Sequence, residues 1–241
     1  MAQTILELKN VKKSFGGHEV HKGVTFTLNK GETIGLLGAS GTGKSVLLRS
    51  IIGLEFIDEG KILFEGQEIQ DLSETDYFKV RLQLSYSFQS GALFDSLTVY
   101  QNLAFPLVEH TDLSSEEIND RILEMLKLID LKGKEHLLPA ELSGGMQKRV
   151  GMARSIILNP KVVLYDEPTA GLDPSNTLNI INLMKRLKER EITGIFVTHD
   201  IPAAFKVCDR ILILFDGQIA INDTPENLLH SSNPIVKRFL V

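Results

Sequence analysis

The fold of this chain is decided by Gly38-Ala39-Ser40-Gly41-Thr42-Gly43-Lys44-Ser45, which has the form G-x-x-x-x-G-K-S of a phosphate-binding loop. The apolar run at residues 32–37 before it is typical of a strand, and residues 46–52 after it are typical of a helix. In that setting the glycines turn backbone N–H groups inward around phosphate oxygens, and the helix start adds a positive dipole end. The alternative is a glycine-rich turn that only connects two elements. We predict nucleoside triphosphate binding, with Lys44 neutralising the β- and γ-phosphates and Ser45 holding Mg²⁺.

Composition narrows the class of protein. The 241 residues carry a formal net charge of −5, so bulk charge gives no reason to expect a nucleic-acid partner. The single cysteine, Cys208, excludes an internal disulfide and a cysteine-based metal cluster, as is usual in a reducing cytosol. No apolar stretch approaches the roughly 18 residues that a membrane-spanning helix needs, and residues 1–4 do not begin a signal peptide. We expect a protein that is soluble by itself.

The order of elements predicts the architecture. Residues 4–38 have the pattern of three strands with turns at Gly16-Gly17 and Lys30-Gly31, and an edge-type strand is expected at residues 61–66. Residues 90–159 change to helical character, including a capping box at residues 114–117. From residue 161 onward strands and helices alternate again. This order predicts an α/β nucleotide-binding core that carries an inserted helical lobe.

A second chemical site is expected where the buried strand at residues 162–165 ends in Asp166 and Glu167. A carboxylate at the end of a core strand beside a phosphate loop can hold Mg²⁺ through water, which is the role we expect of Asp166. Glu167 follows where the chain leaves the sheet, and from there it could orient or deprotonate a water that attacks the γ-phosphate. The alternative is a surface acidic pair, which four preceding apolar residues disfavour.

A third feature is Leu142-Ser143-Gly144-Gly145-Met146-Gln147, which begins an amphipathic helix. A serine and two glycines at a helix start form a second end that attracts anions. Alone, this segment could equally be a serine N-cap followed by glycines. One chain with two phosphate-binding helix ends needs an explanation.

The explanation is a resemblance to the ATP-binding-cassette (ABC) ATPases, which covers essentially the whole chain. In the order of that family the chain has a Q-loop glutamine at Gln89, the signature at residues 142–146, a D-loop at residues 170–173 and a switch histidine at His199. The resemblance implies an α/β fold: a P-loop NTPase (RecA-like) core with an antiparallel β subdomain and an inserted α-helical subdomain. Residues 1–241 would form a single ABC ATPase domain. Its core and β subdomain would occupy about 1–89 and 160–241, and its helical signature subdomain about 90–159.

The resemblance also implies roles for residues whose local pattern leaves them open. It implies a head-to-tail dimer, in which each ATP lies between the phosphate loop of one copy and the signature of the other. By pattern alone, Phe15 could be a core residue, and Gln89 or His199 an ordinary strand-end residue. In the family, Phe15 would stack on adenine, where Tyr is commoner, Gln89 would sense Mg²⁺ and nucleotide, and His199 would contact the γ-phosphate. The expected nucleotide contacts beyond residues 38–45 are Phe15, Gln89, Ser143, Gly144, Gly145 and Asp173; the metal contacts are Ser45, Gln89 and Asp166; the catalytic pair is Glu167 and His199.

Two classes of function fit an ABC ATPase: a subunit that powers a membrane transporter, and a soluble ATPase that acts on ribosomes or DNA. One cassette, a helical lobe of ordinary size and a negative net charge favour transport. Residues 88–99, 142–150 and 233–240 resemble the Mla-type lipid transporter ATPases that work with MCE-domain proteins. That resemblance implies transport of lipid, specifically phospholipid, through a separate transmembrane permease. It also implies an MCE-domain protein as a further partner and a location on the cytoplasmic side of the inner membrane. An importer of amino acids or other small polar solutes is the alternative.

The helical lobe is expected to contact the permease. Residues 90–105 follow Gln89 directly and include Leu93, Phe94, Val99 and Phe105, which is more apolar surface than an exposed segment usually carries. We expect a docking groove there. The alternative is that these side chains pack the core of the lobe itself.

Overall fold

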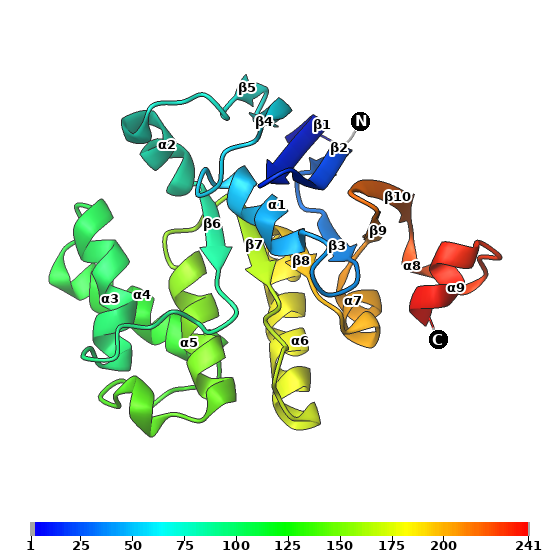
Figure 1. Ribbon diagram of the computed structural model, residues 1–241. Coiled ribbons are helices and arrows are strands. Elements are labelled where there is room, and N and C mark those ends of the chain that lie inside the picture. The colour runs from blue at the N-terminus through cyan, green and yellow to red at the C-terminus, as the bar shows by residue number, and fades with distance from the viewer. Residues whose placement is uncertain (1–2, 241) are drawn as a thin grey trace.

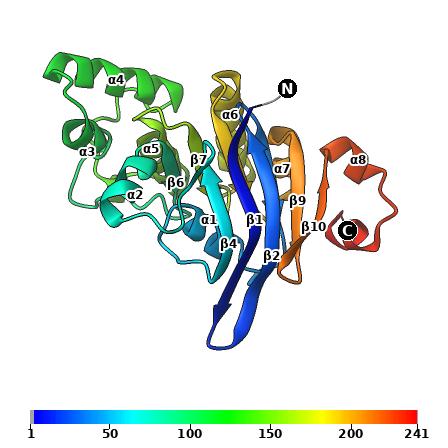
Figure 2. The same ribbon diagram turned by 90° about the horizontal axis from the view of Figure 1, so that it is seen from above.

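The computed structural model describes residues 3–240 and contains two sheets (Figures 1 and 2). Residues 1 and 2, part of the start at which we expect no signal peptide, lie outside the described residues. The first sheet is antiparallel, with the order β2-β1-β4-β5, and the second has the order β10-β9-β3-β8-β7-β6. Within the second sheet β10 runs antiparallel to β9 and the other neighbours are parallel. The strands are β1 (Thr4–Phe15), β2 (His18–Asn29), β3 (Thr33–Leu37), β4 (Glu59–Phe64), β5 (Gln67–Glu68), β6 (Leu84–Ser87), β7 (Val162–Asp166), β8 (Thr193–Val197), β9 (Arg210–Phe215) and β10 (Gln218–Asp223).

The helices separate into a core group and a lobe (Figure 1). The helical lobe lies beside β6, at the opposite end of the molecule from the two last helices. Within residues 3–240 no helix has both the length and the apolar character needed to cross a membrane. The helices are α1 (Lys44–Ile51), α2 (Glu74–Arg81), α3 (Val99–His110), α4 (Ser115–Leu128), the 3₁₀ turn Pro139–Glu141, α5 (Gly144–Ile156), α6 (Pro174–Glu189), α7 (Ile201–Val207), α8 (Pro225–Leu229) and α9 (Pro234–Leu240).

Strand burial explains how the layers are stacked. All five residues of β3, of β7 and of β8 are buried, as expected for strands covered on both faces. Along β7, Val162 and Leu164 belong to a core cluster shared with α1 and the antiparallel sheet. Val163 and Tyr165 belong to the other cluster, shared with α5, α6, α7 and the lobe. The parallel sheet is therefore the middle layer of the molecule. The loops of the candidate site follow the carboxyl ends of its strands.

Local sequence signals placed the starts of α4 and α6 correctly. Ser114 and Glu117 form the predicted capping box at the start of α4, and Asp173 caps α6 with Pro174 as its first residue. On β2, Val24, Phe26 and Leu28 are buried while Thr25 is exposed. One face of that strand therefore packs into the core, and the other faces solvent, as its alternating pattern indicates. The predicted edge strand at residues 61–66 is wrong in one respect. That strand, β4, lies between β1 and β5, because Leu63 and Phe64 pair with the short β5.

The predicted docking groove is only partly exposed. Val99 is fully buried, and Leu93 and Tyr100 pack against the core of the lobe, so these side chains follow the alternative that we left open. Phe94 and Phe105 are exposed and form an edge-to-face pair with ring centroids 5.1 Å apart. The positions of these residues around α3 explain why some are buried and others exposed. Val99 and Leu103 lie on the side of the helix that packs into the core of the lobe, and Phe105 lies on the opposite, exposed side.

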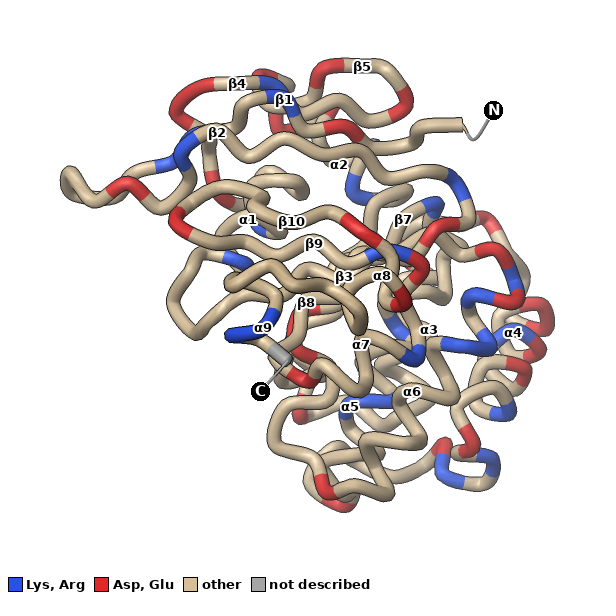
Figure 3. The backbone as a smooth tube through the Cα atoms, turned by 90° about the vertical axis from the view of Figure 1, so that its right-hand side faces the viewer, with Lys and Arg blue, Asp and Glu red and all other residues tan. Residues whose placement is uncertain are grey.

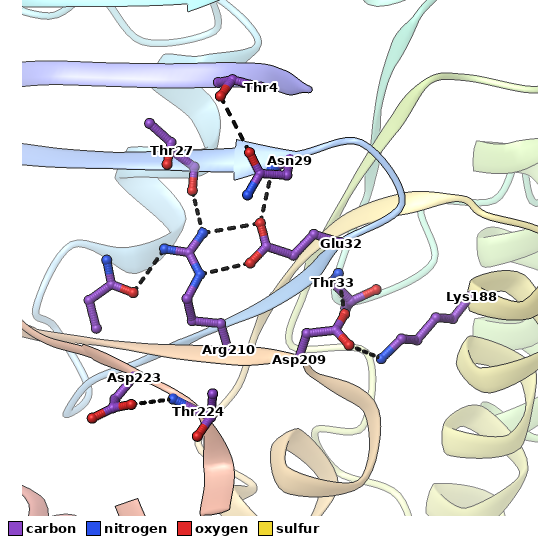
Figure 4. A network of polar contacts seen from close by, with 11 residues as sticks. Thr4, Thr27, Asn29, Glu32, Thr33, Lys188, Asp209, Arg210, Asp223 and Thr224 are labelled. Carbon is purple, nitrogen blue, oxygen red and sulfur yellow. Dashed lines mark hydrogen bonds and ion pairs between the residues drawn. The ribbon is translucent and has the colours of Figure 1, made fainter. Parts of the chain in front are cut away.

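A polar network ties the two sheets together where the parallel strands begin (Figure 4). Arg210, the first residue of β9, donates to both oxygens of Glu32, at 2.7 and 3.1 Å, and to the carbonyl of Thr27 at 2.6 Å. Asp209 accepts from the Thr33 backbone N–H at 3.0 Å and from Lys188 at 2.6 Å. This network fixes the start of β3, the strand that leads into the phosphate loop.

Candidate active site

The predicted functional residues other than the signature residues and Asp173 lie together at the carboxyl ends of β3, β6, β7 and β8, where ligands bind in open α/β sheets. There the chain forms an open cavity of about 500 Å³. The cavity is lined by Phe15, Val20, Ser40, Gly41, Gly43, Lys44, Ser45, Val46, Arg49, Gln89, Glu167 and His199. The sequence pattern predicts Gln89 at the end of a strand. Because β6 ends at Ser87, Gln89 instead lies in the following loop, from which it reaches the cavity.

The phosphate loop needs glycine for conformation and for space. Gly43 has a φ of 93°, and a Cβ there would lie 2.4 Å from Val20 Cγ1 and 2.8 Å from His21 Nε2. A Cβ at Gly38 would lie 2.9 Å from the carbonyl oxygen of Leu214. Lys44 donates to the carbonyls of Gly38 and Ala39 at 2.9 and 3.0 Å. The loop therefore curls around its own lysine.

Burial lowers the pKa of Lys44, and the nearby carboxylates of Glu167 and Asp166 act in the opposite direction. A desolvated ammonium is an unfavourable charge that a phosphate would neutralise. The loop thus holds a partly desolvated ammonium group, which a bound phosphate would stabilise.

The predicted metal contacts lie together. Ser45 Oγ donates to Asp166 Oδ1 at 2.8 Å, and Tyr86 donates to the other oxygen, Oδ2, at 2.5 Å. Among the described residues, no group of three or more His, Cys, Asp or Glu side chains could hold a metal by itself. A hydroxyl beside one carboxylate fits Mg²⁺, which keeps several waters and takes the rest of its ligands from substrate phosphates. The donor set therefore suits a metal that arrives with a nucleotide.

Glu167 and His199 form a pair at the cavity wall. His199 Nδ1 lies 2.8 Å from Glu167 Oε2, and the His199 backbone N–H donates to the same oxygen at 3.3 Å. Glu167 has a φ of 49°, in the left-handed region that non-glycine residues rarely adopt. Such residues occur often at active sites. The imidazole is mostly exposed, whereas the carboxylate is only 13% exposed. His199 is thus bonded to a carboxylate that is largely shielded from solvent.

Phe15 is not a core residue. It lies at the end of β1, is 44% exposed and lines the cavity, while Lys13 lies over its ring at 4.8 Å from the centroid. An exposed aromatic face at the rim of a phosphate cavity is suited to stacking on a planar base.

The signature residues are held elsewhere on the chain. Ser143 caps α5 by accepting from the Met146 N–H at 3.3 Å, and Ser143, Gly144 and Gly145 are not among the residues that line the cavity. A Cβ at Gly145 would lie 2.2 Å from Asn176 Oδ1, so the start of α5 packs tightly against α6. Asp173 also faces its own helix, where it accepts from Ser175 and Asn176. Within one chain these predicted contacts are not brought to the phosphate loop.

Sequence patterns missed several residues of the site. Tyr86, Arg49 and Lys148 line a second cavity of about 610 Å³ beside Asp166, and the Lys148 ammonium donates to the carbonyl of Ala170. His21, which is buried, contacts the Gly43 carbonyl through Nε2 at 3.1 Å, and burial lowers its pKa. Each of these residues lies in an ordinary strand or helix pattern. Tyr86, Lys148 and His21 contact residues that are at least 22 positions away, so no local pattern marks them.

This fold and this site define a nucleotide-binding α/β ATPase of the P-loop class. A model of the ABC transporter family matches residues 21–170, more than half of the chain. The chain therefore belongs to the ABC transporter family, as an ATP-hydrolysing subunit of such a transporter.

Relatives and experimental structures agree with that assignment. The chain is 41% identical to the probable ribonucleotide transport ATP-binding protein mkl of Mycobacterium leprae, over 98% of this chain and 68% of that protein. It is 37% identical to the intermembrane phospholipid transport system ATP-binding protein MlaF of Haemophilus influenzae, over 100% of this chain and 91% of that protein. It is also 37% identical to the methionine import ATP-binding protein MetN of Clostridium acetobutylicum, over 98% of this chain and 74% of that protein. The dimeric post-hydrolysis structure of the ATP-binding cassette MJ0796, with ADP and Pi, matches with a TM-score of 0.84 at 33% identity, over 92% of this chain and 99% of that one.

Proposed function

We propose that the carboxyl-end cavity binds Mg²⁺·ATP and hydrolyses it with Glu167 as the general base. Lys44 neutralises the β- and γ-phosphates, and Phe15 stacks on the adenine. Glu167 accepts the proton of the attacking water, while His199, bonded to it at 2.8 Å, keeps the carboxylate oriented and contacts the γ-phosphate. Mg²⁺, held by Ser45, Asp166 and Gln89, would supply charge neutralisation on the phosphates. The observation that carries this proposal is the convergence of these side chains on one cavity.

We further propose that catalysis needs a second copy of the chain. The signature residues begin α5 but line neither phosphate-loop cavity of their own chain, so their N–H groups are available to a nucleotide on another copy. The MJ0796 cassette, with which this chain shares its fold, forms a dimer. In this arrangement Ser143, Gly144, Gly145 and Asp173 complete the site of the neighbouring copy. The helical subdomain at about 90–159 that carries them is part of the same proposal.

The permease is proposed to dock where the lobe meets the Q-loop. Phe88, Phe94, Phe105 and Val108 are all exposed, and a hollow of about 190 Å³ lies between the Q-loop, α3 and α5. Basic and acidic residues are interspersed over α4 and the antiparallel sheet (Figure 3). This patch is mainly aromatic and aliphatic, and its one basic side chain, Arg154, lies over the Phe94 ring and lines the hollow. An exposed apolar patch of this kind fits a protein partner. Through that partner the ATPase would be held at the cytoplasmic side of the inner membrane.

We propose phospholipid as the transported substrate, in a system of the Mla type with an MCE-domain protein. The supporting observation is the match to MlaF, which extends over 100% of this chain and 91% of that protein. No residue of an ATPase subunit contacts the cargo, so this step is carried by similarity.

The test is to purify the transporter from its native membrane through a tag on this chain, and to identify the co-purified subunits and lipids. We expect a multi-spanning permease, an MCE-domain protein and bound phospholipid. Reconstituted complex should move labelled phospholipid between vesicles with ATP, and a Lys44→Ala complex should not. A complex that contains a soluble solute-binding protein and no lipid would overturn the lipid proposal while leaving the ATPase untouched.

Import of a small polar solute is the second candidate. It is favoured by the names of two other relatives, which concern ribonucleotide transport and methionine import. The chain covers 68% and 74% of those proteins, less than it covers of MlaF. Under this candidate, transport assays with amino acids or nucleotides would respond to ATP and lipid transfer would not.

A further inference from the structure

His21 is a buried histidine that the proposed reaction does not use. It lies on β2, opposite Lys13 of β1, and is 1% exposed. Its Nε2 atom lies 3.1 Å from the carbonyl oxygen of Gly43, and its Nδ1 atom is buried without a hydrogen-bond partner among the described residues. A carbonyl oxygen can only accept, so Nε2 carries the hydrogen and donates it. Burial lowers the pKa of His21, although the bond to Gly43 acts in the opposite direction, so the imidazole is neutral at pH 7.

The acceptor of this bond is the last glycine of the phosphate loop. Gly43 is the N-cap of α1, and its carbonyl also accepts the first helical bond, from the Leu47 N–H at 2.9 Å. Gly43 has no side chain and a φ of 93°, so the residue itself does little to fix how its peptide faces. His21 contributes that constraint from the neighbouring strand, and Val20 closes the space on the same side of the glycine.

The direction of the Gly43 carbonyl decides where the next N–H points. No cis peptide bond occurs in the part of the chain that the structure describes, so the Gly43 carbonyl and the Lys44 N–H point in opposite directions from one peptide plane. The carbonyl points toward His21 and along α1, toward Leu47. The Lys44 N–H therefore points out of the first helical turn, where such groups have no partner within the helix. This is the side from which a phosphate approaches a helix N-terminus.

The rest of the phosphate loop is held by bonds within the loop. Lys44 donates to the carbonyls of Gly38 and Ala39, and the Thr42 hydroxyl donates to the Ala39 carbonyl at 2.9 Å. Across residues 3–240, His21 is the one side chain from outside the loop that hydrogen-bonds to the backbone of residues 38–43. It is not among the residues that line the cavity, so a bound nucleotide has no need to displace it.

We propose that His21 is a positioning residue of the phosphate site, which holds the Gly43–Lys44 peptide in the orientation that phosphate binding needs and thereby raises nucleotide affinity. This inference rests on the role proposed above for the loop in binding ATP. A peptide that is already oriented spares the nucleotide the ordering of the loop, and such preorganisation raises affinity. The arrangement lowers stability, because it buries an imidazole whose Nδ1 atom has no partner among the described residues.

The test replaces His21 with two residues of similar size and measures the binding of a fluorescent ATP analogue with Mg²⁺. His21→Met cannot donate, and we expect it to weaken affinity by about 3- to 10-fold, the effect of losing one neutral hydrogen bond. His21→Gln can place an amide N–H near the position of Nε2, so its affinity should stay within about twofold of the wild type. In thermal unfolding without nucleotide, His21→Met should be at least as stable as the wild type, because it removes the unpartnered polar atom. A merely structural role cannot give lower affinity with undiminished stability.

Phe26→Leu is the matched control on the same strand. Phe26 is 4% exposed and lines neither cavity beside the phosphate loop, so this variant should lose stability and keep the wild-type affinity. Wild-type affinity in His21→Met, or equal losses in His21→Met and His21→Gln, would overturn the positioning role. A Lys44→Ala chain that binds the analogue normally would instead overturn the proposed nucleotide site itself.

Discussion

The two ends of the parallel sheet carry polar clusters of opposite character. At the end where the strands begin, Arg210 and Glu32 share a two-pronged ion pair, and Asp209 takes donors from Thr33 and Lys188 (Figure 4). At the end where the strands finish, Lys44 bonds only to carbonyls of its own loop. The first cluster is satisfied by the folded chain, and the second is arranged for a ligand. The comparison shows that charged side chains stabilise the fold at one end, where they pair with each other. At the other end the lysine has no acidic hydrogen-bond partner and is available to a ligand.

The largest effect is expected from removing the lysine of the phosphate loop. Lys44→Ala should abolish nucleotide binding or hydrolysis, because the phosphates lose their one predicted loop cation. The matched control is Lys188→Ala at the other end, which removes an ion pair that is 33% and 44% exposed. Such a pair contributes about 0–1 kcal/mol, so ATP turnover of the control should stay near wild type. Phosphate release measures both. Near-normal turnover in Lys44→Ala would contradict the assignment of the loop.

The second-largest effect on ATP turnover is expected from Glu167, and Glu32 at the other end of the sheet is its control. Glu167→Gln keeps the shape of the side chain but cannot accept a proton, so turnover should fall by about a hundred- to ten-thousand-fold. ATP should still bind, and the variant should accumulate as an ATP-dependent dimer in size-exclusion chromatography. Glu32→Gln should leave turnover intact and lower the free energy of unfolding by about 1–3 kcal/mol, because a charge-assisted pair with Arg210 is weakened.

A monomeric Glu167→Gln protein that releases phosphate at more than about a tenth of the wild-type rate would refute the general-base role. Asp166 would then have to serve both metal and water. A large loss of turnover in Glu32→Gln would instead show that the start of β3 contributes to catalysis through the loop that it feeds.

The third effect tests whether the site is shared between copies. Ser143→Arg removes a cap of α5 and places a bulky cation where a neighbouring nucleotide would lie. ATP binding by the monomer should persist, while hydrolysis within the assembled transporter should fall at least about tenfold. Ser114→Arg removes an equivalent cap at α4, so it controls for lost helix stability, which is typically about 1 kcal/mol. Wild-type hydrolysis by the Ser143→Arg complex would count against the dimer.

Sequence reasoning found the parts of the site that have local patterns. The phosphate loop, Asp166 and Glu167 each follow an apolar strand, and the structure brings them together with Gln89 and His199. Those motifs are short and contiguous, because a helix start or a strand end is set by neighbouring residues. A parallel core sheet with an added antiparallel sheet could be expected from the family resemblance, whereas the interior position of β4 could not. It depends on β5, a strand of two residues that leaves no periodic signal.

Contacts between distant residues stayed hidden for a physical reason. Tyr86 meets Asp166 across 80 residues, and Arg210 meets Glu32 across 178. Nothing in the sequence near a tyrosine in a short strand shows which side chain will face it from the next strand. Likewise, the apolar residues near α3 divide between core and surface according to helix register, so Val99 is buried and Phe105 is exposed. Pairing across the fold must be seen in the structure.

The smallest effect compares two aromatic residues of one β-hairpin that spans both ends. Phe15 lies at the nucleotide end and is 44% exposed, whereas Phe26 lies toward the other end and is 4% exposed. Phe15→Ala should weaken ATP binding by about 3- to 10-fold, corresponding to about 0.5–1.5 kcal/mol of aromatic contact, with little change in stability. Phe15→Tyr keeps the π-face and should bind ATP as the wild type does. Phe26→Ala should instead lower stability by about 3–5 kcal/mol, because it empties part of the core. Nucleotide titration and thermal unfolding distinguish the two, and a Phe15→Ala chain that binds ATP normally would show that adenine is held elsewhere.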